Sequence, residues 1–283
     1  MIEQVDLFVD ILSASSRKSE PVNITDLVTH LACDLVVLLS LGFALKLQSE
    51  STNRFMISGM FRANQLPRYK KILETMIKSR LSDDKGIRED LFSIMTSAMD
   101  RGENIQLSDI WTEAISFFPA GALPILAATS AVYFYLAHNR HCYERLAYEI
   151  RETFALNRDI KGGPQLANCR YLEQLAADEK GKPLIIDGHV IPPGTQLGVN
   201  IFALHHNEKY FPNPYEFIPE RTLMHQVFAP FSVGYGSCAG KSVTYLEASL
   251  IIAKTLWNFH LYDVISGQHD GPYLIFTSRG KGL

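Results

Sequence analysis

Apolar residues recur at helical spacing through the first half of the chain. In residues 23–47 the polar Asn23 and Thr25 precede a long run in which leucines return every three or four positions. This spacing is typical of a helix with one apolar face, and either polar residue is a suitable amino-terminal cap. The pattern predicts one buried helix, or two in succession.

Two more helices are expected after a polar break. Residues 81–86, LSDDKG, interrupt the apolar pattern. The amphipathic stretch at residues 87–104 then predicts a helix closed by Gly102, because glycine readily terminates a helix. A further helix is expected to begin near Ser108, whose hydroxyl can cap it.

The next segment, Ile115 to Ala137, contains no charged side chain. At about 1.5 Å per residue such a helix would cross a bilayer core of roughly 30 Å. A membrane span is therefore one interpretation, and a long core helix is the other. Pro119 and Pro124 predict a kinked or interrupted helix in both cases.

The pattern changes after residue 157. Residues 182–206 contain two short β-rich runs joined by Asp187-Gly188, which is a hairpin signal. Proline and aromatic residues then indicate an ordered loop, and helical spacing returns from Ala239 onward. We expect a single domain over residues 1–283. It would be helical over 1–157, β and loop over 158–230, and a cysteine loop with its following helix over 231–283.

Composition excludes several function classes. The 283 residues are 47% hydrophobic and 20% charged, with a formal net charge of −3. The chain can therefore bury a core, and it offers no basic patch for nucleic acid. Its four cysteines include no Cys-x-x-Cys pair, so neither a disulfide framework nor a structural zinc site is indicated. A reducing compartment is expected, and the acidic first residues do not resemble a secretory signal.

One cysteine has distinctive surroundings. Cys238 lies among Gly234, Gly236 and Gly240 and directly before a predicted helix. A thiolate at a helix start is stabilised by unpaired backbone N–H groups, which favours a nucleophile or a metal ligand. The alternative is a buried structural cysteine beside a glycine-rich turn. Cys33, Cys142 and Cys169 lack such surroundings and are interpreted as structural.

Phe231, Gly234, Cys238 and Gly240 match the Phe-x-x-Gly-x-Arg-x-Cys-x-Gly signature of the cytochromes P450. Upstream, the segment Phe217 to Arg221 resembles the family's Pro-Glu-Arg region, and residues 115–137 stand where the family's long helix crosses the haem. The chain is similar to enzymes of fungal secondary metabolism. The resemblance implies a mainly α fold with a small β region, here a partial P450 fold without the amino-terminal part and the Glu-x-x-Arg helix.

The resemblance also implies a cofactor, partners and a location. The cofactor would be haem b, with its iron ligated by the Cys238 thiolate, while Phe231, Gly234 and Gly240 shape the loop. NADPH-cytochrome P450 reductase would donate electrons for the oxidation of a small organic substrate. The family lies on the cytosolic face of the endoplasmic reticulum membrane. The family's amino-terminal anchor has no counterpart in the sequence, so a cytoplasmic location is the alternative, with residues 115–137 a weaker span candidate.

Four departures from the family pattern are visible. Gly236 replaces the arginine that pairs with a haem propionate, and His225 and Lys241 are the nearby cations that would substitute for it. Leu123 and Pro124 replace the acid and alcohol that deliver protons to bound oxygen, while Thr129 and Ser130 come more than one turn too late. No Glu-x-x-Arg occurs in the chain, as though that segment were excised near residues 172–175. The region preceding the family's middle helices also has no counterpart.

Three functions remain open at this point. The first is a P450-type monooxygenase of secondary metabolism. The second is a degenerate, non-catalytic remnant that acts at most as an interaction module. The third is a haem-thiolate enzyme that rearranges peroxides without activating oxygen, because the acid and alcohol pair is missing.

Overall fold

The structure is a computed structural model that describes residues 1–61, 66–82, 90–169, 200–219, 227–232, 237–265 and 271–279. Its elements are α1 (Ile2–Lys18), β1 (Val22–Asn23), α2 (Ile24–Leu41), α3 (Phe55–Phe61), α4 (Leu66–Ser82), α5 (Leu91–Asp100), α6 (Leu107–His138), α7 (Arg140–Thr153), the short 3₁₀ helix η2 (Asn157–Asp159), α8 (Pro164–Ala167), α10 (Ile201–His205), α11 (Lys241–Asn258), β2 (Phe259–Ile265) and β3 (Tyr273–Ser278).

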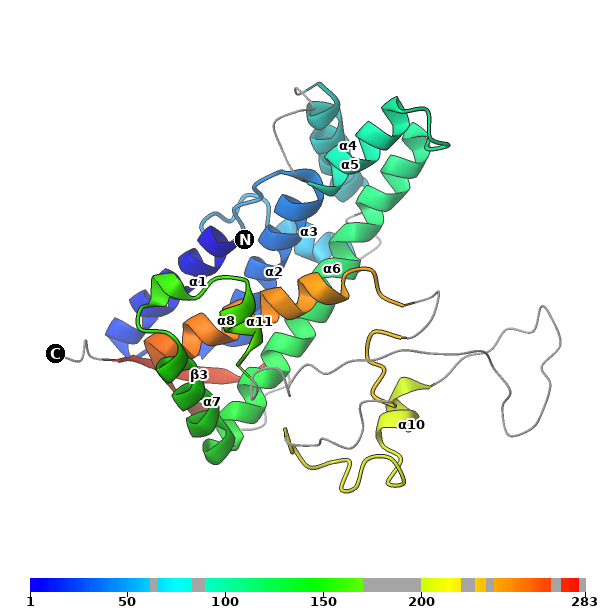
Figure 1. The fold of residues 1–283 in the computed structure, drawn as a ribbon. Helices are drawn as coiled ribbons and strands as arrows, with labels where there is room; N and C mark the ends of the chain where they lie inside the picture. Colours follow the sequence, from blue (N-terminus) through cyan, green and yellow to red (C-terminus); the bar gives the residue numbers. More distant parts are fainter. Residues whose placement is uncertain are drawn as a thin grey trace, which may run out of the picture.

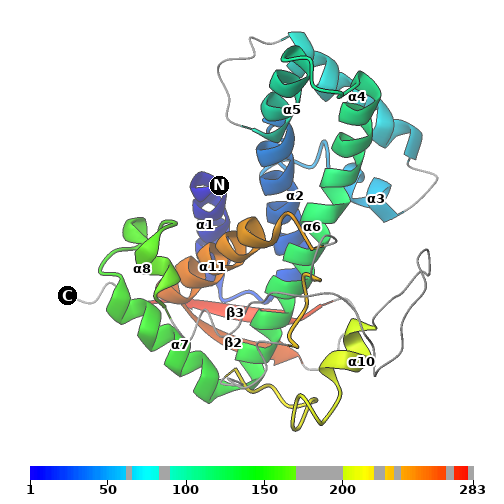
Figure 2. The same ribbon diagram turned by 45° about the vertical axis from the view of Figure 1, so that its right-hand side comes forward.

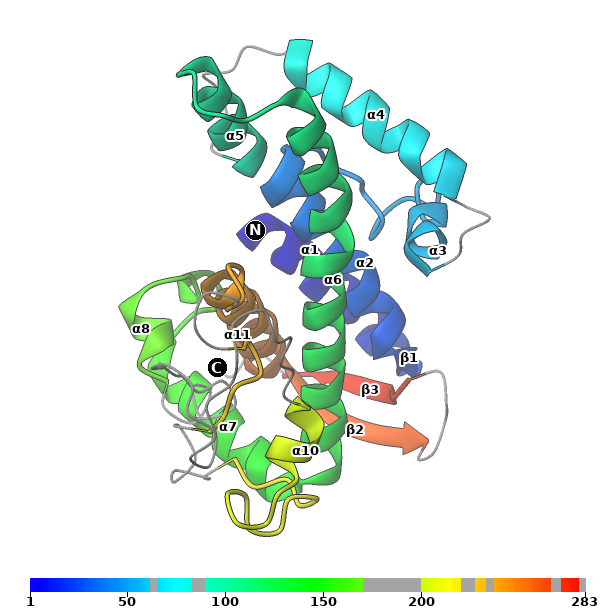
Figure 3. The same ribbon diagram turned by 90° about the vertical axis from the view of Figure 1, so that its right-hand side faces the viewer.

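The long helix α6 runs through the middle of the molecule, and the other elements are arranged around it (Figures 1–3). Helix α2 packs along α6, while α4 and α5 cover its amino-terminal part. Helices α7 and α11 and the small sheet lie around its carboxyl-terminal half. The expectation of a mainly α fold with a small β region is confirmed.

Helices α2 and α6 approach closely because Gly121 has no side chain. A Cβ at this position would lie 2.7 Å from a methyl carbon of Val36 on α2, which is too close for any other residue without rearrangement. The buried side chains of α6 return every three or four residues, as the helical period requires. They are Ile110, Ala114, Phe118, Ala122, Ile125, Thr129, Tyr133 and Leu136.

The two prolines do not interrupt α6, which is helical from Leu107 to His138. Pro119 is half-buried and Pro124 is exposed, so both lie off the buried stripe and no core contact is lost at either position. The start of the helix also differs from the expectation. Its cap is Gln106 instead of Ser108, and the Gln106 N–H donates to the Asp109 carboxylate at 2.8 Å.

The start of α2 agrees with the prediction. Asn23 is its amino-terminal cap, with its side-chain oxygen accepting the N–H groups of Thr25 and Asp26. Among the described residues, α2 and Ser108–His138 are the two helices long and apolar enough to cross a membrane, and most of α2 is buried within the protein. Core helices share these properties, so neither helix establishes a membrane span.

The small sheet joins two strands from the carboxyl-terminal part of the chain to the short strand β1 near its start. It is antiparallel in the order β1-β3-β2, with Val22 opposite Leu274 and Phe259 opposite Ser278. The prediction had placed β structure only before residue 231 and therefore missed β2 and β3. The predicted hairpin at Asp187-Gly188 lies outside the described residues.

The prediction of β structure is wrong at the carboxyl-terminal end of residues 182–206. Residues 201–205 form the short helix α10, because the Asn200 side chain accepts the Ala203 N–H at 3.1 Å and caps a helical turn. Asparagine at a cap favours a helix even where the following residues are apolar.

Helix α11 is held from three sides. Its Lys254 is fully buried and pairs with Asp6 of α1. On the α6 side the Tyr133 hydroxyl donates to Thr255 Oγ1 at 2.7 Å, and α7 packs along a third side. The helix that follows the cysteine loop is therefore anchored to the core. In Figure 2 its amino-terminal end is level with the middle of α6.

Candidate functional site

Cys238 lies in the loop that leads into α11, two residues before the helix cap Gly240. Its thiol is free and exposed, whereas Cys33, Cys142 and Cys169 are buried. Its backbone N–H donates to the Phe231 carbonyl at 2.8 Å. A backbone hydrogen bond therefore joins the two ends of the loop, and the sulfur remains available to a ligand.

Gly240 keeps the space beside this sulfur free. A Cβ at Gly240 would lie 3.8 Å from Cys238 Sγ, and no other described atom beyond its two chain neighbours comes within 4 Å of it. This is an ordinary contact distance, so the local fold does not require glycine. The structure therefore brings Phe231, Cys238 and Gly240 together, while Gly234, Gly236 and His225 lie outside the described residues. Lys241 is the first residue of α11.

Two features of the loop were not anticipated from the sequence. Ser232 has a φ of 60°, the left-handed region that non-glycine residues rarely adopt. The Phe231 ring packs edge-on against Tyr245 of α11, with the ring centroids 5.0 Å apart. An aromatic one turn inside the helix was the available signal, but helical spacing alone does not say which loop residue it meets.

The segment upstream of the loop packs against the end of α6. Phe217 stacks on Tyr135 with centroids 4.8 Å apart and rings nearly parallel, and Pro219 is buried. Glu220 and Arg221, which complete the Pro-Glu-Arg segment, lie outside the described residues.

The middle of α6 presents small and apolar groups. Leu123 is half-buried and Pro124 is exposed, and the neighbouring Ala120, Ala127 and Ala128 are exposed as well. None of these side chains can transfer a proton. Thr129 does not replace them, because it is fully buried and its hydroxyl makes no hydrogen bond among the described residues.

A buried carboxyl group lies on α11 beyond the loop. Glu247 is 3% exposed, and one of its carboxyl oxygens has no hydrogen-bond partner among the described residues. Burial raises the pKa of Glu247 to about 7, against a smaller opposing effect of the amino-terminal ammonium group. The carboxyl therefore takes up a proton near neutral pH.

This raised pKa makes stability depend on pH. The folded protein holds the Glu247 proton more tightly than the unfolded chain, so the stabilising effect is complete below about pH 4.5 and is lost as pH rises through about 7. Between these values the free energy of unfolding should fall by up to roughly 3 kcal/mol. Glu247→Gln should remove most of this slope in urea unfolding series, whereas Glu144→Gln, at an exposed carboxyl, should retain it. An unchanged slope in Glu247→Gln would contradict the assignment.

Comparisons with known proteins support the fold. The family model described as Cytochrome P450 matches residues 179–270, a range that includes the cysteine loop. The cytochrome P450 monooxygenase apf8 of Gibberella fujikuroi is 30% identical over 243 residues, covering 67% of this chain and 66% of the relative. The chain belongs to the cytochrome P450 family.

Two further P450 relatives and one solved P450 structure support this. The cytochrome P450 monooxygenase lcsN of Purpureocillium lilacinum is 27% identical over 275 residues, covering 78% of this chain and 82% of the relative. AKT7 of Alternaria alternata is 29% identical, covering 69% and 43%. The crystal structure of the P450 CYP102L1 aligns with a TM-score of 0.80 at 17% identity, covering 98% of this chain and 73% of that structure.

The chain spans 43% to 50% of the length of several curated P450 relatives that it matches. The solved structure, at 17% identity, establishes the fold alone.

The family binds a haem iron, and the described residues fit one axial ligand. The exposed sulfur of Cys238 and the glycine at position 240 beside it leave room for a ligand. Within the described ranges, no three His, Cys, Asp or Glu side chains gather as they would to hold a metal ion.

Proposed function

We propose that this chain is a haem-thiolate protein that oxidises a small organic molecule in fungal secondary metabolism, with Cys238 as the axial ligand of haem b. The observation that carries the proposal is the exposed Cys238 thiol, which lies just before α11. The backbone N–H of Cys238 is held by a hydrogen bond to the Phe231 carbonyl. Among the four cysteines it alone combines exposure with the family's loop motif.

Each loop residue would have a distinct role. Cys238 supplies the thiolate, and the amino-terminal end of α11 stabilises its negative charge. Gly240 leaves room beside the sulfur, and Phe231 holds the loop through its carbonyl. Gly234 is proposed to complete the loop. When bound, a thiolate-ligated haem supplies oxygen chemistry in which the sulfur's electron density favours O–O cleavage.

Substrate and partners follow from the same proposal. The substrate would be a small organic molecule lying against the apolar middle of α6, where Ala127 and Ala128 offer small exposed side chains. NADPH-cytochrome P450 reductase would supply electrons, on the cytosolic face of the endoplasmic reticulum membrane. No nucleic acid is involved.

A second function is favoured by one observation. Leu123 and Pro124 occupy the middle of α6 where the family carries an acid and an alcohol, so this helix cannot pass protons through those two positions. A haem-thiolate protein without that relay would be suited to rearranging organic peroxides, which bring their own O–O bond. Turnover with an organic peroxide, but not with reductase and oxygen, would select this function.

The proposal is tested by adding haem to the purified chain. We expect a thiolate-ligated Soret band in the reduced carbon monoxide complex, together with protection of Cys238 from iodoacetamide. Cys238 is the exposed thiol of the native chain, so about one thiol should react before haem is added and almost none afterwards. A folded, monodisperse chain that gives neither result would instead support the non-catalytic remnant.

A further inference from the structure

We propose that Tyr245 is a positioning residue that sets the place of the Cys238 sulfur by holding the Phe231 ring. The inference rests on the proposed function, because it concerns the same thiolate. Tyr245 would act through its ring contact with Phe231.

The contacts form a short chain from α11 to the thiol. The Tyr245 ring meets the Phe231 ring at 66°, with centroids 5.0 Å apart, which is a favourable edge-to-face geometry. The carbonyl of Phe231 accepts the Cys238 N–H at 2.8 Å. Phe231 therefore links the two groups, contacting Tyr245 through its ring and Cys238 through its carbonyl.

The Tyr245 end of this series of contacts is anchored to the core, whereas the Cys238 end lies at the surface. Tyr245 lies on α11, which is anchored to α1 through Lys254 and to α6 through Thr255. Cys238 and Ser232 are exposed, and Ser232 adopts its left-handed conformation in a turn closed by its N–H on the Ala229 carbonyl at 3.0 Å. The aromatic contact therefore ties Phe231 to an anchored helix.

The contact with Phe231 is made by the aromatic ring of Tyr245 and does not depend on a charge. Burial raises the pKa of Tyr245 to about 12, so its hydroxyl remains neutral at physiological pH. Phenylalanine at this position keeps the ring that contacts Phe231 and should preserve the positioning effect, and an aliphatic residue should abolish it.

The experiment compares Tyr245→Leu with Tyr245→Phe and with Tyr148→Leu. Tyr148 is 67% exposed on α7, which makes its replacement a matched control far from the loop in sequence. We expect Tyr245→Leu to weaken haem binding about fivefold, the effect of losing one aromatic pair. It should also lower the thiolate-ligated fraction in the reduced carbon monoxide spectrum. Tyr245→Phe and Tyr148→Leu should remain within about twofold of the wild type.

A double-mutant cycle separates positioning from general destabilisation. Phe231→Leu alone should weaken haem binding at least as much as Tyr245→Leu, and the double variant should lose little more than Phe231→Leu, since both single changes break the same contact. Additive losses would overturn the proposal, as would a Tyr245→Leu protein that binds haem like the wild type. Should Tyr245→Leu fail to fold, Tyr245→Met offers a flexible side chain of similar length.

Failure of the proposed function would be visible separately. If the wild-type chain binds no haem, the proposed function fails. Tyr245 is then tested by the alkylation rate of Cys238 in the haem-free chain. Positioning predicts that Tyr245→Leu and Phe231→Leu each accelerate this rate about two- to fivefold and that the effects are not additive. Unchanged rates would overturn the positioning role.

Discussion

Cys238→Ala should abolish the thiolate-ligated Soret band of the reduced carbon monoxide complex. The substitution removes the exposed sulfur while leaving the backbone N–H that donates to the Phe231 carbonyl, so the loop should keep its closure. The number of thiols that react with iodoacetamide in the native chain should fall from about one to near zero, because the three remaining cysteines are buried. Absorption spectroscopy and mass spectrometry measure the two effects.

Cys142→Ala is the control for this experiment. Cys142 is buried on α7, and its replacement should leave both the Soret band and the reactive thiol unchanged. A thiolate band that survives in Cys238→Ala, or disappears in Cys142→Ala, would assign the ligand to another cysteine.

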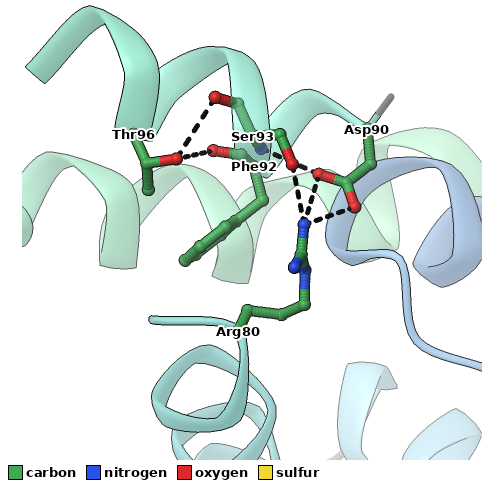
Figure 4. A network of polar contacts seen from close by, with 5 residues as sticks. All are labelled: Arg80, Asp90, Phe92, Ser93 and Thr96. Atoms are coloured by element: carbon green, nitrogen blue, oxygen red, sulfur yellow. Dashed lines mark hydrogen bonds and ion pairs between the residues drawn. The ribbon is translucent and has the colours of Figure 1, made fainter. Parts of the chain in front are cut away.

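Arg80→Met should destabilise the protein by about 3 to 5 kcal/mol, the usual cost of leaving one partner of a buried ion pair alone. Arg80 on α4 donates to both Asp90 oxygens, at 2.8 and 3.1 Å, and to Ser93 Oγ at 2.7 Å (Figure 4). Both charged side chains are almost completely buried. Asp90 also caps α5 by accepting the Ser93 N–H at 2.8 Å, so the network joins α4 to the start of α5.

An exposed ion pair provides the control for Arg80→Met. Arg101 and Glu103 lie at 2.7 Å with more than half of each side chain exposed, and Arg101→Ala should cost less than about 1 kcal/mol because water screens the pair. Guanidinium unfolding measures both variants. Equal costs in the two variants would contradict the structural role of the buried network. The double variant Arg80→Met/Asp90→Ala should cost less than the sum of the single changes.

Local patterns in the sequence predicted the helices α2, α5, α6 and α11. Asn23 predicted the cap of α2, and the charge-free run ending at Ala137 predicted the core of α6, because capping and the helical period depend on neighbours along the chain. The start of α6 was placed at Ser108 instead of Leu107, since several polar residues before a helix can each cap it. The helix α10 was missed because the cap at Asn200 outweighed the apolar residues that follow.

The candidate site divides in the same way. Phe231, Cys238 and Gly240 were predicted from a motif, which is a property of consecutive residues. Tyr245 was not, because its partner lies across a loop and only the folded chain brings the two rings together. The Arg80–Asp90 network was missed for the same reason.

The sequence alone predicts the family's cysteine loop, the placement of Leu123 and Pro124 where the family carries an acid and an alcohol, and the helical character of the first half of the chain, because each prediction depends on residue identity and spacing. Only the tertiary structure decided that Cys238 is exposed while the other three cysteines are buried, and that Thr129 is turned into the core. Exposure and contact depend on which distant segments pack together, and that packing is a property of the whole fold.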